Sequence, residues 1–139
     1  MTKPMKRTKI IVIGASRLGA NIARMLSERG EDVLMIDKDP EAFNKLSDGF
    51  SGYTICGDAT DMSFLEANGI ASAKKVIVAT EDDNVNILLA HASFYVYDVP
   101  RIYLRLSDCD KGKLIENTSI RAIYPFLLSI NEFQFLDKE

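Results

Sequence analysis

The residues most suited to chemistry lie in one short glycine-rich segment near the amino terminus, Gly14-Ala15-Ser16-Arg17-Leu18-Gly19. The segment matches the dinucleotide-binding fingerprint G-x-G-x-x-G, except that Ser16 stands at the middle glycine. It follows a β-branched apolar run and opens an amphipathic segment, which is the strand–turn–helix context that the fingerprint needs. Because a helix N-terminus offers unpaired N–H groups and a positive dipole end, we predict a phosphate site here. The alternative is a plain glycine-rich turn with a solvent-facing arginine.

Each position in this segment has an expected role. Gly14 permits the tight turn, and Gly19 lets the following helix lie close to the sheet. Arg17 adds a fixed positive charge and a bidentate donor fork for phosphate oxygens. Ser16 would crowd a pyrophosphate, although its hydroxyl could also bond one.

A carboxylate ends the second apolar run of the chain. Asp37 follows residues 33–36 and lies about 20 residues after the fingerprint, the spacing typical of a group that accepts hydrogen bonds from both ribose hydroxyls. Such a carboxylate repels a 2′-phosphate, so NADP is disfavoured. The positive charge of the neighbouring Lys38 slightly reduces this repulsion. The alternative is a loop aspartate, or a helix cap shared with Asp39.

Two further polar loops follow predicted strands, at residues 57–60 and 80–83. The carboxyl ends of parallel strands are where open α/β sheets bind ligands. Capping explains both loops at least as well. Thr80 would be the N-cap of a capping box with Asp83 at its third position, and Thr60 or Asp58 would cap the helix after the first loop.

The elements that must position these residues alternate regularly. Short apolar runs predict strands over residues 9–14, 33–36, 53–56, 75–80, 101–106 and 122–124. Helical periodicity predicts helices over residues 17–29, 40–46, 60–68, 82–97 and 108–117. This alternation predicts an α/β fold: a Rossmann-like, doubly wound, six-stranded parallel sheet between two helical layers.

Composition narrows the function classes. A chain of 139 residues corresponds to one domain, and a net charge of −3 disfavours nucleic acid as a partner. No apolar run approaches the length of a membrane span. Cys56 and Cys109 are too far apart for a metal motif and indicate reduced thiols in a cytosolic protein. A single histidine, His91, excludes histidine-based triads, so we expect neither catalytic nor metal-ligating residues.

Taken together, residues 11–19, 33–37, 57–60, 76–80, 82–84 and Asn86 resemble the RCK/KTN domain. This is the N-terminal nucleotide-binding domain of Trk-type (TrkA) potassium uptake proteins. Residues 101–108 resemble the fifth strand of that family, and 123–125 its sixth strand with a trailing proline. The resemblance runs from about Lys9 to Ile130.

The resemblance implies a cytoplasmic regulator held at the inner face of the membrane by a potassium transporter or channel. It implies at least a homodimer, and an adenine nucleotide as cofactor: NAD(H), ATP, ADP or AMP. By position, residues Gly14 to Gly19 would hold phosphates and Asp37 the ribose. Asp58 and Ala59 would lie by the adenine and Thr80 at the mouth of the cleft, with Lys38, Thr60 and Ala79 beside them.

The resemblance also divides the chain. Residues 1–8 form a basic tail, residues 9–126 the nucleotide-binding domain, and residues 127–139 an apolar tail that would start a crossover helix. Seven large apolar residues between Phe126 and Leu136 favour packing on a partner subunit, although a helix folded back on its own sheet is equally compatible. The second lobe common in the family would lie beyond these residues, in a longer chain, or be lacking in a short member.

Three functions therefore compete. The leading one is a non-enzymatic nucleotide sensor that regulates potassium transport. An NAD-dependent oxidoreductase is the second, but it lacks a substrate domain and an evident acid/base pair. The third is a structural interaction domain with a vestigial nucleotide site, which the departure at Ser16 supports.

Overall fold

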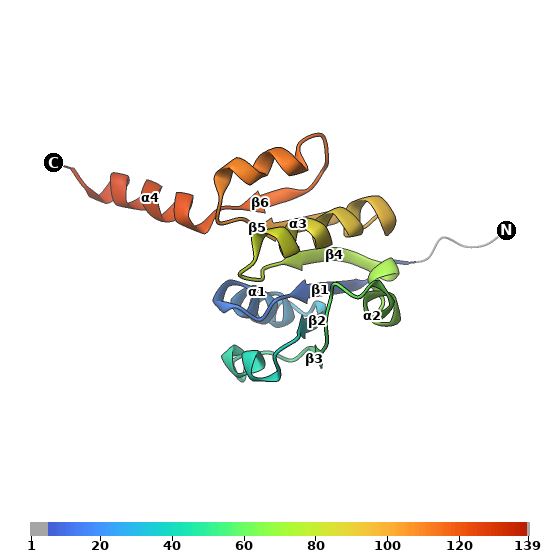
Figure 1. Cartoon of the computed structure of the whole chain (residues 1–139). Helices are drawn as coiled ribbons and strands as arrows, with labels where there is room; N and C mark the ends of the chain where they lie inside the picture. Colours follow the sequence, from blue (N-terminus) through green and yellow to red (C-terminus); the bar gives the residue numbers. More distant parts are fainter. Residues whose placement is uncertain (1–5, 139) are drawn as a thin grey trace.

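The computed structural model describes residues 6–138 and has the predicted α/β architecture. Within these residues six strands form one parallel sheet in the order β3-β2-β1-β4-β5-β6. The strands are β1 Lys9–Ile13, β2 Asp32–Asp37, β3 Tyr53–Cys56, β4 Ala73–Val78, β5 Arg101–Arg105 and β6 Arg121–Ile123. The order reverses between β1 and β4, which is the point where doubly wound sheets bind ligands (Figure 1).

Helical segments connect the strands. They are α1 Arg17–Glu28, η1 Pro40–Lys45, α2 Met62–Ala67, η2 Ile70–Ser72, α3 Asp83–His91, η3 Ala92–Val96, η4 Cys109–Ile115 and α4 Pro125–Leu136. The predicted helices over 40–46 and 108–117 are 3₁₀ rather than α. Both begin after an aspartate cap, at Asp39 and Asp108, and both are short, as 3₁₀ segments usually are.

The predicted long helix over 82–97 changes character halfway. Its second part, η3, is a π-helix in which the Tyr97 N–H donates to the Ala92 carbonyl. The Ser93 hydroxyl donates to the carbonyl of Leu89, which in a regular α-helix would accept from the N–H of Ser93 (2.7 Å). The Ser93 hydroxyl thus bonds within the helix at the point where the π-turn begins.

The two faces of the sheet pack against different helices. Alternate residues of β1, β2 and β4 pack with Leu65 of α2 and Leu89 of α3 on one face. The residues between them pack with Ala23 and Leu26 of α1 and Ala42 of η1 on the other. Right-handed crossovers on either side of the switch point produce this separation of the helices.

The start of α1 lies unusually close to the sheet. A Cβ added to Gly19 would lie 1.9 Å from the Gly14 carbonyl oxygen, and one added to Gly14 would lie 2.7 Å from the Thr80 nitrogen. Gly14 also has φ +99°, which favours glycine. Ala20 and Ala23 continue the thin contact along the helix. The two fingerprint glycines thus allow β1, α1 and the end of β4 to meet backbone to backbone.

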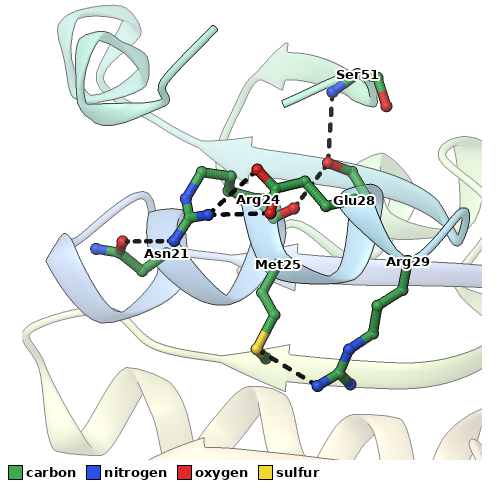
Figure 2. A network of polar contacts seen from close by, with 7 residues as sticks. Asn21, Arg24, Met25, Glu28, Arg29 and Ser51 are labelled. Atoms are coloured by element: carbon green, nitrogen blue, oxygen red, sulfur yellow. Dashed lines mark hydrogen bonds and ion pairs between the residues drawn. The ribbon is translucent and has the colours of Figure 1, made fainter. Parts of the chain in front are cut away.

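The outer face of α1 carries polar contacts instead (Figure 2). Arg24 donates to Glu28 one turn later and also to Asn21. The Ser51 N–H donates to the hydroxyl of Ser27, which ties the loop before β3 to the helix (3.4 Å). These contacts orient the solvent side of α1 and leave its first turn free for the site.

The basic segment before β1 is anchored at Arg7. Residues 1–5 lie outside the described residues, but the Arg7 guanidinium donates to the carbonyls of Ala73 and Tyr97. Arg7 therefore joins the amino end of β4 to the end of the π-helix.

The last helix, α4, projects away from the sheet (Figure 1). None of its residues is buried, and seven large apolar side chains are exposed: Phe126, Leu127, Leu128, Ile130, Phe133, Phe135 and Leu136. Within the part of the chain that the structure describes, α4 does not fold back on its own sheet.

We expect Gly19→Ala to destabilise the domain by more than about 3 kcal/mol, because the added Cβ would overlap a backbone oxygen that cannot move without breaking the turn. Denaturant unfolding measures the change. Gly30→Ala is the control: nothing lies within 4 Å of its added Cβ, so only its φ of +83° is strained, at about 1–2 kcal/mol. Equal losses for the two variants would contradict the close approach.

Candidate functional site

A cleft of about 630 Å³ opens across the carboxyl ends of four neighbouring strands. It is lined from the ends of β1, β2, β3 and β4 and from the helical segments that follow them: Ile13, Gly14, Ala15, Ser16, Ile36, Asp37, Lys38, Asp39, Ala42, Lys45, Gly57, Asp58, Ala59, Thr60, Thr80, Glu81, Asp82, Val85 and Leu89. Its volume and its mixture of apolar and polar groups are those of a small-molecule site. The topological switch point thus coincides with the cleft.

Ser16 is turned into the protein and does not crowd the cleft. Its hydroxyl donates to the Ala79 carbonyl (2.6 Å) and accepts from the Gly19 N–H (3.2 Å), so Ser16 is the N-cap of α1. Its φ of −69° and ψ of 174° are ordinary extended values that any residue adopts. The N–H groups of the first turn, at Arg17 and Leu18, have no acceptor within a helix and remain available to an anion.

Asp37 joins two loops of the cleft. One carboxylate oxygen accepts from the Ala15 N–H (2.8 Å), and the other accepts from the Asp39 N–H (2.8 Å). A carboxylate has about four lone-pair sites, so these two bonds leave each oxygen one further site for a donor in the cleft. Asp37 is half-buried, and its backbone carbonyl also accepts from the Gly57 N–H (3.0 Å).

Asp58 is held in an ionised form by its own loop. It accepts from the Thr60 hydroxyl (2.7 Å) and from the Thr60 N–H (2.9 Å). These two bonds, with the charge of nearby Lys38, lower the pKa of the Asp58 carboxyl. The observed N-cap of α2 is Asp61, one residue after this turn, and its side chain accepts from the Ser63 N–H. The expectation that Thr60 or Asp58 caps this helix was wrong.

Thr80 likewise is not a helix cap. Asp82 caps α3 by accepting from the N–H groups of Asn84 and Val85, whereas the Thr80 hydroxyl donates to the buried Asn86 side chain. Asn86 in turn donates to the carbonyls of Thr80 (3.0 Å) and Arg105 (2.9 Å). This amide joins the ends of β4 and β5, a partnership across the sheet that local spacing does not reveal.

The predicted site residues divide into two groups. Nine line the cleft: Gly14, Ala15, Ser16, Asp37, Lys38, Asp58, Ala59, Thr60 and Thr80. Arg17 is exposed, Leu18 is half-buried, and Gly19 and Ala79 are buried beneath the turn, all four outside the lining. Ala79 and Gly19 act through Ser16, since they hold its hydroxyl.

Ten lining residues were not among the predicted site residues: Ile13, Ile36, Asp39, Ala42, Lys45, Gly57, Glu81, Asp82, Val85 and Leu89. Lys45 and Ala42 come from η1, Val85 and Leu89 from α3, and Glu81 from the loop between β4 and α3. The helical ones lie in the segments that directly follow strands β2 and β4, and only Ala42 and Val85 lie in first turns.

The histidine and the two cysteines of the chain do not line the cleft. The His91 Nε2 lies 2.7 Å from the Leu114 carbonyl oxygen, a contact between α3 and η4. Cys56 and Cys109 are unpaired thiols. Among residues 6–138, no three histidine, cysteine or acidic side chains gather as a metal site would require.

None of the helices in this same range is long and apolar enough to cross a membrane.

The inward hydroxyl of Ser16 makes a testable difference between two small substitutions. Ser16→Ala should lower the free energy of unfolding by about 1 kcal/mol, because the Gly19 N–H loses its acceptor, whereas Ser16→Gly should cost only a few tenths. Thermal or urea unfolding measures both. A Ser16→Ala variant as stable as the wild type would contradict the cap.

Comparison with known proteins places this geometry in a family. The family model of the TrkA-N domain matches residues 10–125. The Trk system potassium uptake protein TrkA homolog of Pyrococcus horikoshii is 35% identical over 115 residues, which are 83% of this chain and 50% of the relative. The chain thus spans about half the length of the curated relatives it matches.

Solved structures share the fold. The NAD(P)-binding domain of an exopolyphosphatase-related protein from Archaeoglobus fulgidus has a TM-score of 0.74 and 25% identity, and the match covers 96% of this chain and all of that one. The Kef C-terminal domain of Shewanella denitrificans, in AMP-bound form, has a TM-score of 0.69 and 21% identity, with 94% and 82% covered. With the family model matching most of its length, this chain belongs to the TrkA-N domain family.

Proposed function

We propose that the cleft binds an adenine nucleotide, and that its occupancy regulates a potassium uptake system or channel. The observation that carries this proposal is the Asp37 carboxylate, which is fixed by two backbone N–H groups and keeps acceptor capacity toward the cleft. A rigid acceptor at the end of β2 suits the paired hydroxyls of a ribose.

The phosphates would lie over the first turn of α1. Two N–H groups of that turn are free by helix geometry, and the dipole adds a positive end. Because the Ser16 hydroxyl is bonded to the Ala79 carbonyl, it does not extend toward a phosphate over this turn. The adenine would lie toward β3, against Ala59 and Gly57. The Kef domain, which was solved with AMP, is similar in fold and supports an adenine nucleotide as the class.

The regulatory part of the proposal draws on the relatives. The relatives from Pyrococcus horikoshii and Streptomyces coelicolor are named Trk system potassium uptake proteins, and this chain matches about half of the length of each. We place the protein in the cytoplasm, at the inner membrane face beside a transporter subunit. The cleft carries ribose and phosphate positions without an evident acid/base pair for hydride chemistry, which favours a regulator over an oxidoreductase. A nucleotide acts here by binding one arrangement of subunits better than another.

A second copy of the chain is the partner that we propose for α4. The helix is apolar around most of its circumference, a character typical of helices enclosed by other elements. The sheet meanwhile has an uncovered area. Tyr103 of β5 and Ile123 of β6 face the α1 side and are only half-buried. A helix from a second copy would cover this area, and exchange of the two helices gives a closed symmetric dimer.

Removal of single ribose hydroxyls tests the role of Asp37. We expect the wild type to bind AMP roughly ten- to a hundredfold more tightly than 2′-deoxy-AMP, because a hydrogen bond to a charged acceptor is lost. In Asp37→Ala the two ligands should bind within about twofold of each other. Isothermal titration calorimetry measures all four affinities.

The comparison of ligands separates binding from folding, because Asp37→Ala also removes two acceptors from backbone N–H groups. Asp39→Ala, a change of a neighbouring cleft carboxylate that caps η1, should keep the full difference between the ligands. A wild type that does not distinguish AMP from 2′-deoxy-AMP would refute the ribose assignment.

The dimer has its own test on α4. Sedimentation equilibrium should give a dimer for the wild type and a monomer for Phe133→Asp. A carboxylate at this position could not be buried in an apolar dimer interface unless an opposite charge lay beside it. Asn131→Asp adds the same charge at a polar position of the same helix and should remain dimeric. A wild-type monomer, or equal masses for the two variants, would count against the second copy.

A further inference from the structure

The two ends of the cleft differ in charge. The ends of β2 and β3, with η1, contribute three carboxylates and two amines: Asp37, Asp39, Asp58, Lys38 and Lys45. The β4 end contributes the carboxylates of Glu81 and Asp82, and the described lining residues there include no cation. Negative charge is therefore least compensated where β4 ends.

We infer that Glu81 and Asp82 make the cleft select against a third phosphate, so that its ligand carries at most two phosphates. Any group that the ligand carries beyond the second phosphate is uncharged or cationic. This inference rests on the proposed function, because it takes the ribose to lie at Asp37. The ligand class that fits is an adenine dinucleotide or a nucleoside diphosphate, rather than a triphosphate.

The order of the strands gives the direction in which a bound nucleotide would cross the sheet. A nucleotide with its ribose at β2 meets the N-terminus of α1 next, because β1 lies between β2 and β4. Strands lie about 4.8 Å apart, so β4 is roughly 10 Å from β2. Groups beyond the second phosphate therefore approach the loop of Glu81 and Asp82, where a third phosphate would meet two like charges.

The charges of the two carboxylates are compensated to different degrees by their surroundings. Asp82 accepts from the N–H groups of Asn84 and Val85, so the start of α3 partly compensates its charge. Glu81 is exposed, and no hydrogen bond or ion pair described within residues 6–138 involves its side chain. Arg17, the cation of the fingerprint, is exposed and outside the lining.

Apolar groups lie beside the acidic pair. Val85 and Leu89 of α3 line the same end of the cleft, and Leu89 is buried in the core. An apolar wall next to carboxylates suits a flat ring with little or positive charge better than a phosphate.

A series of related ligands tests the inference. Calorimetry in a low-salt buffer that contains EDTA should show that ADP and ADP-ribose bind about two- to fivefold more tightly than ATP. This factor is the size expected for repulsion between exposed like charges. Glu81→Gln should reduce the ADP-over-ATP preference by a similar factor and leave the ratio of ADP-ribose to ADP unchanged. Higher salt should shrink the same preference in the wild type.

Glu116→Gln is the matched control, since it removes an equally exposed carboxylate outside the cleft and should keep the wild-type preference. ATP binding as tightly as ADP, or an unchanged preference in Glu81→Gln, would overturn the inference while leaving the proposed function intact. Failure of every adenine nucleotide to bind, AMP included, would instead refute the proposed function, and this inference with it.

Discussion

The site depends on how closely three backbone segments approach one another. The turn after β1, the first turn of α1 and the end of β4 meet with no side chain between them, since neither Gly14 nor Gly19 has room for a Cβ. This contact places the N-terminus of α1 directly above the switch point of the sheet. Any residue larger than glycine at these two positions would separate helix and sheet, and the N–H groups of α1 would no longer face the cleft.

Polar side chains then fix the loops that surround this contact. Asp37 accepts backbone N–H groups from the loops after β1 and β2, and Asp83 accepts from the N–H groups of Ser107 and Asp108 after β5. Asn86 serves the ends of β4 and β5 in the same way. Neighbouring strand ends are thus bonded in pairs, so the cleft is largely preformed and a ligand meets oriented groups. Such preorganisation lowers the entropic cost of binding.

The sequence predicted the sheet, both fingerprint glycines and the position of Asp37, because each follows from periodicity or from a steric limit within one strand–turn–helix unit. It could not predict the inward hydroxyl of Ser16, whose acceptor is a carbonyl 63 residues away. The caps were placed wrongly because Thr80, Asp82 and their neighbours are all good cap formers. Contacts across the sheet decide which of them caps the helix. Propensity ranks such residues but does not locate their long-range partners.

The extended backbone at Ser16 has a consequence for how such domains are found. The first and last glycines of the fingerprint answer a steric demand of the polypeptide itself, whereas the middle position has φ −69° and makes no such demand. Searches that require three glycines therefore treat the middle position as if it had the steric demand of the first and last positions. Such searches miss chains like this one. A pattern that allows a small hydroxyl residue in the middle, and remains strict at both ends, follows the physics of the turn more faithfully.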